Sequence, residues 1–438
     1  MVLIFCDKVT PRIEYTFRLF FETLISTDFS LTEDRTEYLN WQGPKLNYSS
    51  DIIDEGLYMK PNSLLSTDEI PQTFPEVFSW EDRQVFFQSD NNSFLPFDPF
   101  AAGFFLAARV EEYRSHPKDA HGRFEENSSF SFSHSFYDTP VVEQWAQLVV
   151  EKIKERYNSF CPPHRKFRFL LTIDIDNAYA FRHQSFLRQT GSTLKNIVQG
   201  EIHEARKRID VLSGNQNDPY DNYNYIRTQA QKNNLDPIYF ILLGDYGTYD
   251  KNLSHRNTHL VELIQSLHSH SEIGIHPSYG AAFSNLRIQK EINRLATITN
   301  GNITKSRQHY IRISLPHSYR TLIKNRISED YSMGLTTLCG FRSGLCTPYP
   351  FFDMVKNCST NLKIVPFQVM DSTLNKSLEY SPQQAIQEIK AKMEEVRKVG
   401  GTFIPVWHNE SLGEYGRWEG WKEVFDEMLG MGVKYMES

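Results

Sequence analysis

Long apolar runs are missing from this sequence of 438 residues: none reaches the ~18 residues that a helix needs to cross a bilayer. The first ten residues, MVLIFCDKVT, lack a basic start, and their apolar run is too short for a secretory signal peptide, so they predict a first β-strand. Cysteine is scarce: five residues are scattered along the chain, an odd number that favours reduced thiols. We therefore expect a cytoplasmic protein without a membrane span.

An excess of one charge is also missing. Basic residues number 47 and acidic residues 54, mixed along the chain, so the net charge of −7 leaves no electrostatic footprint for nucleic acid or for anionic lipid. Hydrophobic residues make up 40% and aromatic residues 13% of the chain, enough for sizeable cores. Because 438 residues exceed what one core usually organises, we expect two domains.

Several common catalytic motifs are absent as well: a GxSxG elbow, a GxxxxGK[ST] phosphate loop, GxGxxG after a strand, and HExxH. The pair His268 and His270, in HSHSEIGIH, has the spacing of an HxH metal motif. It precedes the expected strand, whereas His276 ends it, so the pair would lie at the opposite end of the strand from His276. We interpret the pair as a solvated helix end.

The first 160 residues mix strand-like and helical segments and carry no chemical motif. Residues 11–25, PRIEYTFRLFFETLI, predict a helix after the first strand. Asp98 and Pro99 predict the start of another helix, and apolar residues four apart predict a third over residues 141–157. The paired prolines of CPPHRKFR mark a boundary near residue 162, so we expect an N-terminal α/β domain over residues 1–162 and a second domain over residues 163–438.

From residue 165 onward, short apolar strands alternate with helices. Seven segments have the strand pattern: FRFLLTIDID, PIYFILLGDYG, EIGIHPSYG, HYIRISLP, GFRSG, LKIVPFQVMD and GTFIPVWHN. The clearest helix is SPQQAIQEIKAKMEEVRKVGG, with Ser381 and Gln384 in a capping box and Gly400 at its end. This alternation predicts an α/β fold with a parallel sheet or a barrel.

Polar residues stand at the ends of most of these strands. The carboxyl ends of the strands meet in parallel sheets and barrels, so these side chains can be pooled as one candidate site. The pooled residues are Asp174, Asp176, Asp245, His276, Arg342, Asp371 and His408.

Asp174 and Asp176, in TIDIDN, are two residues apart and so share a face of one strand. Two adjacent carboxylates repel unless a cation or a shared proton relieves them, and a divalent metal held by carboxylate and imidazole does so. Each residue also has a plainer interpretation: the aspartates could cap the next helix, and His276 or His408 alone could be a hydrogen-bonded structural group. Their common position at strand ends in one half of the chain favours a metal site.

The order of these segments resembles the polysaccharide deacetylase (NodB-homology) superfamily: TIDID, IGIH, an Arg-Gly strand, an aspartate-bearing strand, then a histidine near the C-terminus. The resemblance covers roughly residues 165–438, and SRQHY, DYSMG, GFRSG, PFQVMD and WHNE suggest a divergent bacterial branch with an extra N-terminal domain. It implies a distorted (β/α)7 barrel. It also implies an enzyme that removes acetyl groups from N-acetylated sugars with a divalent metal, for which we expect zinc.

The resemblance assigns a role to four of the strand-end residues. Asp174, the first aspartate of TIDID, would be the general base. Asp176 and His276 would bind the metal. His408 would be the general acid that protonates the leaving amine.

The resemblance also implies supporting residues. Arg342 of GFRSG, or else Arg307 of SRQHY, would hold the base carboxylate, and Asp371 would orient the general acid. The family usually has a second histidine four residues after the first, but Gly280 stands there in IGIHPSYG. We take His309 as the candidate third metal ligand, because it is two residues from Arg307 and so shares a strand face with it. This requires the strand to be ITKSRQH rather than HYIRI.

These observations predict a metal-dependent deacetylase with a carbohydrate substrate, no nucleic-acid partner and an undetermined oligomeric state. Two alternatives stay open at this point. The missing second histidine favours a non-catalytic descendant that binds a glycan or a partner through the same cleft. The same site could also hydrolyse another amide or an ester.

Overall fold

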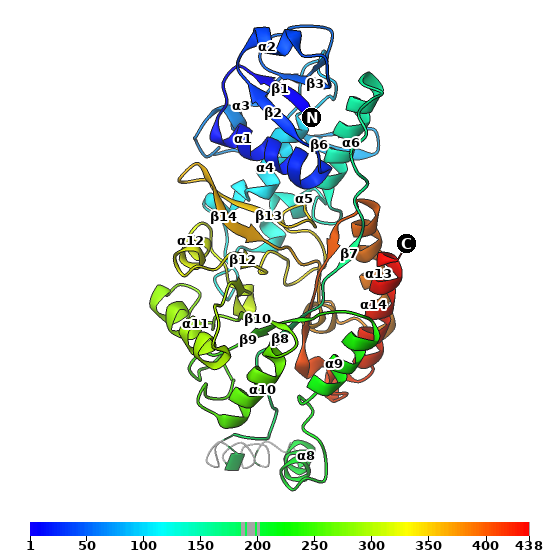
Figure 1. The fold of residues 1–438 in the computed structure, drawn as a ribbon. Helices are drawn as coiled ribbons and strands as arrows, with labels where there is room; N and C mark the ends of the chain where they lie inside the picture. The colour runs from blue at the N-terminus through cyan, green and yellow to red at the C-terminus, as the bar shows by residue number, and fades with distance from the viewer. Residues whose placement is uncertain (185–188, 191–197, 199–201, 438) are drawn as a thin grey trace.

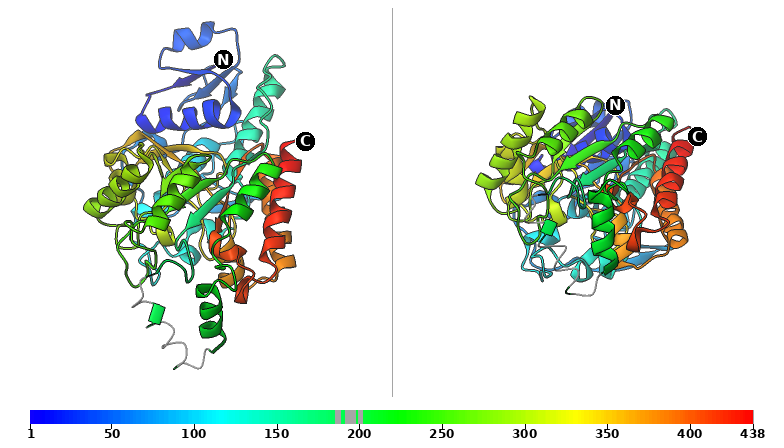
Figure 2. Two further views of the ribbon diagram at one scale, coloured as in Figure 1. Left: turned by 60° about the horizontal axis from the view of Figure 1, so that its bottom comes forward. Right: turned by 90° about the horizontal axis from the view of Figure 1, so that it is seen from below.

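The computed structural model describes residues 1–184, 189–190, 198 and 202–437, and it has two parts. In Figure 1 the N-terminal strands and helices form the upper part, and a larger sheet with its helices forms the lower part. The left view of Figure 2 shows the same division, with the first strands (blue) at one end of the molecule. Among the described residues, no helix is both long and apolar enough to cross a membrane.

A parallel four-stranded sheet organises the start of the chain, in the order β2-β1-β3-β4. The inner strand β1 (Val2–Cys6) is buried along its whole length, which confirms the predicted first strand. Its neighbours are β2 (Phe29–Thr32) and β3 (Lys45–Tyr48), and β4 (Leu57–Tyr58) pairs with the outer side of β3. The helix predicted over residues 11–25 forms as α1 (Pro11–Phe17) and its continuation η1 (Arg18–Ile25).

Two longer helices complete the core of this part. The helix α4 (Pro99–Ala107) begins as predicted, because the Asp98 carboxylate accepts hydrogen bonds from the backbone nitrogens of Phe100 and Ala101, both at 3.0 Å. The helix α6 (Val141–Arg156) buries its predicted apolar face. The shorter elements are α2 (Arg35–Asn40), α3 (Ser63–Ser66), β5 (Val77–Trp80), β6 (Arg83–Phe86) and α5 (Phe130–Ser133).

A nine-stranded sheet organises the second part, in the order β13-β14-β12-β11-β10-β9-β8-β17-β15. Neighbouring strands run parallel except β13 and β14, an antiparallel pair at one edge. The strands are β8 (Thr172–Ile175), β9 (Ile238–Ile241), β10 (Glu272–Ile275), β11 (Lys305–Ser306), β12 (Glu329–Asp330), β13 (Tyr349–Asp353), β14 (Cys358–Ile364), β15 (Val369–Met370) and β17 (Pro405–His408). The mixed α/β class with parallel strands is confirmed.

The strand pairing does not show a closed (β/α)7 barrel, because β13 and β15 stand at the two ends of the sheet. The stretch that joins β14 to β15 makes single backbone hydrogen bonds in place of a ladder. Phe367 donates one to Met333 at 3.1 Å, and Gln368 donates one to Ile404 at 3.2 Å. A short pair outside the main sheet, β7 (Arg168–Phe169) with β16 (Thr402–Phe403), precedes β8 and β17 along the chain.

Two predicted strands are wrong. HYIRI does not pair, because Tyr310 and Ile311 have φ angles of 59° and 52°, which no extended strand adopts. The strand lies earlier, at β11, within the alternative segment ITKSRQH. GFRSG is a turn, closed by a backbone hydrogen bond of 2.9 Å from Gly344 to Phe341.

Helices cover the sheet, with α10, α11 and α12 on one side of Figure 1 and α13 and α14 on the other. The predicted capping box of Ser381 and Gln384 is present at the start of α13. His268 ends α10 and is exposed, as is His270, so the solvated helix end is confirmed. The helices of this part are α8 (Ile202–Leu212), α9 (Tyr223–Lys232), α10 (Thr258–His268), α11 (Asn285–Thr299), α12 (His317–Lys324), α13 (Pro382–Lys398) and α14 (Trp421–Met436).

The two parts share a buried interface. Phe104 on α4 packs edge-on against Phe352 on β13, with 5.1 Å between ring centroids. The carboxylate of Glu143 on α6 accepts backbone hydrogen bonds from Cys346 and Thr347, both at 2.9 Å. Apolar and polar contacts therefore hold the parts together, and the division at residue 162 stays a prediction.

Candidate active site

The carboxyl ends of β8, β10 and β17 open into one cavity of about 510 Å³. The strand register explains the gathering: Asp174 on β8 pairs with His408 on β17, and Ile275 at the end of β10 pairs with Ser306 on β11. Side chains at and just beyond these positions therefore meet. Five predicted site residues line the cavity: Asp174, Asp176, His276, His309 and His408.

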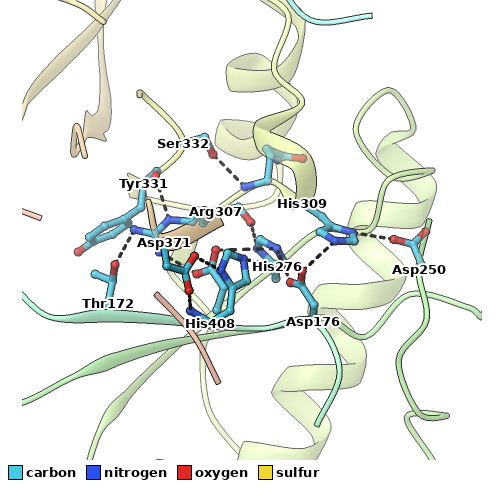
Figure 3. Close-up of polar contacts among 12 residues, drawn as sticks. Thr172, Asp176, Asp250, His276, Arg307, His309, Tyr331, Ser332, Asp371 and His408 are labelled. Atoms are coloured by element: carbon cyan, nitrogen blue, oxygen red, sulfur yellow. Dashed lines mark hydrogen bonds and ion pairs between the residues drawn. The ribbon is translucent and has the colours of Figure 1, made fainter. Parts of the chain in front are cut away.

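Asp176, His276 and His309 form a compact cluster (Figure 3). One carboxylate oxygen of Asp176 lies 3.1 Å from Nε2 of His276, and the other lies 3.2 Å from Nε2 of His309. A ligand atom from each of the three residues lies within 4.8 Å of the others. The structure thus brings together the three residues predicted as metal ligands.

Both imidazoles are held by their other ring nitrogen. Nδ1 of His276 lies 2.6 Å from the backbone oxygen of Arg307, and Nδ1 of His309 lies 2.9 Å from a carboxylate oxygen of Asp250. In a neutral imidazole, an Nδ1–H donated to oxygen leaves Nε2 with a free lone pair, the arrangement that metal-binding histidines use. The sequence analysis missed Asp250, which lies in the loop after β9 rather than at the end of a strand.

The charges of this cluster suit a cation. Burial opposes the ionisation of Asp176, but the charge on His309 and the hydrogen bond from His276 hold the pKa of its carboxyl well below the usual range. Burial also lowers the pKa of His309, but Asp176 and Asp250 outweigh it and raise that pKa to about 9. One carboxylate and two imidazoles are a donor set of catalytic zinc sites, where a bound metal replaces the protons of its ligands. The residues fit a divalent metal.

Arg307, the second of the two predicted arginines, holds Asp174. Its Nη1 lies 2.7 Å from a carboxylate oxygen of Asp174. Its Nη2 donates to the hydroxyl of Thr172 at 2.8 Å, and its Nε donates to the backbone oxygen of Tyr331 at 3.0 Å. These three contacts fix the buried guanidinium, so Asp174 is held beside the cluster, 4.0 Å from Nε2 of His276.

Arg342, the first of the two arginines, is not at the cavity. Its guanidinium forms a buried ion pair with Glu112 of the N-terminal part at 2.9 Å. The physical reason is the turn at GFRSG, which directs this side chain to the interface between the parts instead of to a strand end. Arg342 is therefore not the arginine that holds Asp174, and Arg307, the alternative in the prediction, makes that contact.

His408, at the end of β17, is fixed by Asp371 (Figure 3). Nδ1 of His408 lies 2.7 Å from one oxygen of the buried Asp371 carboxylate, and the other oxygen accepts the backbone N–H of His408 at 2.7 Å. Burial lowers the pKa of His408, but Asp371, with Asp176 and Asp174, outweighs burial and raises it to about 10. Nε2 lies 3.8 Å from the Asp176 carboxylate, so a protonated imidazole would present its proton to the cavity.

Two other positions lie outside the cluster. Asp245 is exposed and pairs with Lys290 at 2.9 Å and Arg294 at 2.5 Å, both on α11. Gly280 follows β10, and a Cβ atom placed there would meet the side chain of Arg287. The strand-end pattern thus pooled Asp245 with the candidate site although its side chain lies at the surface.

Comparison with known proteins covers the two parts differently. Residues 2–158 match the family described as "Family of unknown function (DUF7033)". No curated protein matches the sequence. Nine solved chains match.

The first is titled "Crystal structure of putative polysaccharide deacetylase from Mycobacterium smegmatis"; it is 14% identical with a TM-score of 0.40, over 63% of this chain and 86% of that chain. The second is a mutant of "a CE4 family pseudoenzyme with restored enzymatic activity"; it is 11% identical with a TM-score of 0.31, over 63% of this chain and 68% of that chain. Because both TM-scores are low, we base the functional assignment on the geometry of the cavity.

Proposed function

We propose that this protein is a metal-dependent hydrolase that removes acetyl groups from N-acetylated sugars or polysaccharide. One observation carries the proposal: three candidate metal ligands, a buried carboxylate and a carboxylate-paired imidazole line the same cavity. Amide hydrolysis needs a deprotonated water, a stabilised oxyanion and a proton for the leaving nitrogen. The order of the motifs, which resembles the polysaccharide deacetylase superfamily, supports an acetylated sugar as the substrate.

Asp176, His276 and His309 would hold the divalent cation. When bound, such an ion supplies Lewis acidity, and zinc suits this donor set. Asp250 would act through His309, because its hydrogen bond holds the imidazole with Nε2 facing the Asp176 carboxylate.

Asp174 and His408 would divide the proton transfers between them. Asp174, held by Arg307 beside the cluster, is placed to take a proton from the attacking water. His408 is placed to give its Nε2 proton to the leaving nitrogen, because Asp371 holds the other side of the ring. Their separate supporting partners allow one group to act as a base and the other as an acid at the same pH.

The fold proposed for this site is the distorted (β/α)7 barrel. The strands β8, β9, β10, β11, β12 and β17 supply six positions. The chain from β14 to β15 would supply the seventh, because it begins beside β12 and ends beside β17. Such a ring would bring all of the strand ends around one mouth.

The alternative of a non-catalytic binding protein was supported by the missing second histidine, since Gly280 stands in its place. His309 weakens that support, because a third imidazole or carboxylate donor is available without a histidine at position 280. The buried base and the paired acid also exceed what binding alone would require. The alternative of a hydrolase for another amide or an ester uses the same side chains and is separated by the choice of substrate.

The test is the metal content of the purified protein, together with acetate release from a panel of N-acetylated sugars and oligosaccharides. We expect a bound divalent metal and acetate release that stops on chelation and returns with zinc. Bound metal without any hydrolysis would favour the binding protein. Hydrolysis of activated esters alone would favour the other hydrolase.

A further inference from the structure

A loop of the N-terminal part reaches the candidate active site. His121 and Arg123 line the same cavity as Asp176 and His408. Both residues lie in the range 2–158 that matches the family of unknown function. This segment, far from the strand ends in the sequence, therefore forms part of the cavity wall.

The loop has a defined shape and is fastened to the second part. The Asp119 carboxylate accepts hydrogen bonds from the backbone nitrogens of His121 and Arg123, both at 2.9 Å. Arg123 donates to the backbone oxygen of Tyr310 at 2.9 Å, and Arg312 donates to the backbone oxygen of His121 at 2.7 Å. Two arginines, one from each part, thus bind the backbone of the opposite part.

Three tyrosine rings of the second part surround His121. Tyr249 and Tyr279 stack with ring centroids 4.1 Å apart, and Tyr310 lies edge-on to both, at 5.6 and 5.4 Å. The His121 ring centroid lies 4.9 Å from that of Tyr310 and 5.7 Å from that of Tyr249. Tyr249 lines the cavity and is 41% exposed, so an aromatic ring there is available to a ligand.

This aromatic wall adjoins the metal cluster. Tyr310 directly follows His309, and their ring centroids are 4.6 Å apart. Burial and the neighbouring Arg123 lower the pKa of His121, which favours the uncharged form of its ring. Uncharged aromatic faces with hydroxyl groups at their edges suit a pyranose ring, whose C–H face is apolar and whose rim is polar.

We propose that His121, Tyr249 and Tyr310 form a subsite for a sugar ring adjacent to the residue that loses its acetyl group. The substrate would then be an oligosaccharide or polysaccharide rather than a monosaccharide. The inference rests on the proposed function, because the metal cluster places the reacting residue. It also gives the N-terminal part a role in substrate recognition.

The test compares Tyr249→Ala and His121→Ala with the wild type on N-acetylglucosamine and on its β-1,4-linked tetramer. We expect KM for the tetramer to rise roughly 3–10-fold, the value of an aromatic contact, with kcat and metal content kept. KM for the monosaccharide should not change. Tyr246→Ala is the matched control, since Tyr246 is 59% exposed in the same loop and does not line the cavity.

Failure of the subsite differs from failure of the proposed function. Unchanged KM for the tetramer in both variants, or an equal rise for monosaccharide and tetramer, overturns the subsite while the deacetylase stands. If the wild type releases no acetate, calorimetric titration with the tetramer replaces the kinetics. Weaker binding by Tyr249→Ala than by the wild type then supports the subsite, and equal binding or no binding by the wild type overturns it.

Gln308 carries an independent observation. It is fully buried, lines the cavity, and lies between Arg307 and His309. Neither its amide oxygen nor its amide nitrogen has a hydrogen-bond partner among the described residues. A buried amide left unpaired is destabilising, so a polar group that reached it from the cavity would gain its hydrogen bonds.

The geometry points to Gln308 as a substrate-binding residue that donates to and accepts from the polar groups of the sugar. The test is Gln308→Leu, which keeps the size of the side chain and removes both polar atoms. We expect kcat/KM for the tetramer to fall roughly 3–10-fold, the value of one hydrogen bond, while Tm stays the same or rises.

The opposite pattern identifies a structural amide. A lower Tm with unchanged kcat/KM for the folded protein would overturn the assignment. If the wild type is inactive, the affinity for the tetramer in the same titration takes the place of kcat/KM. Unchanged affinity would then overturn the assignment.

Discussion

Two groups of buried charged side chains differ in what surrounds them. At the interface between the parts, Arg109 pairs with Glu111 at 2.9 Å and Glu112 at 2.7 Å, and Arg342 pairs with Glu112 at 2.9 Å. All four side chains are nearly inaccessible to solvent. The charges of the active-site group, in contrast, face a cavity of about 510 Å³.

The difference shows what buried charge can and cannot indicate. Each ion taken out of water costs several kcal/mol unless it is paired, and the interface group is paired within itself. In the cavity, Nε2 atoms of His276, His309 and His408 all approach the one carboxylate of Asp176, at 3.1, 3.2 and 3.8 Å. Buried charged groups therefore indicate a candidate site where several of them converge on an open cavity. Where they pair only with one another, as the interface group does, they indicate a structural contact.

The sharpest separation within the cavity is between the two aspartates of TIDID. Asp176→Asn should lose the metal and all activity, because a proposed metal ligand is removed. Asp174→Asn should keep the metal and lower kcat by ~10²–10⁴-fold, the range for a lost general base. Metal analysis beside acetate release distinguishes the two variants. Equal metal loss in both would show that the roles are assigned wrongly.

The next effect concerns the proton donor. His408→Ala should lower kcat for an N-acetylated sugar by ~10²–10⁴-fold with metal retained, because the leaving amine loses its proton source. The loss should be much smaller on an activated acetyl ester, whose leaving group needs no proton. Parallel assays on both substrates provide the measurement, and equal losses would make His408 a structural residue.

The interface group should behave in the opposite way. Arg342→Met leaves Glu112 with one arginine instead of two, and breaking a buried ion pair costs roughly 3–5 kcal/mol of unfolding free energy. We expect a large drop in Tm, with metal content and kcat of the folded protein unchanged. A strong loss of kcat at unchanged Tm would return Arg342 to the catalytic residues.

The site residues at the ends of regular strands could be predicted from the sequence. Asp174 and His408 lie on paired strands, and parallel pairing alone brings them to one edge. The choice between Arg307 and Arg342 could not be made, because it depends on whether a two-residue strand or a glycine turn forms. Strands this short leave almost no periodic pattern in a sequence.

The loops were beyond prediction for a different reason. Asp250 reaches His309, and His121 reaches the cavity, through loop conformations that side-chain contacts determine. Apolar periodicity does not encode such contacts, although loops carry much of the binding function of proteins. The N-terminal contribution to the cavity was missed because the two segments are distant along the chain.

The smallest expected effect compares two aspartates that follow the same strand, β9. Asp250→Asn should weaken zinc affinity by ~10–100-fold, because the carboxylate that orients His309 loses its charge while its shape is kept. Asp245→Asn is the matched control: this exposed carboxylate pairs with Lys290 and Arg294 on α11, and an ion pair of an exposed carboxylate contributes at most ~1 kcal/mol. Its zinc affinity should equal that of the wild type. Zinc titration against a chromophoric chelator measures both. If the two variants bind zinc equally well, Asp250 does not act through His309. The hydrogen bond of Asp250 would then indicate a role at the metal site no better than the position of Asp245 after the same strand does.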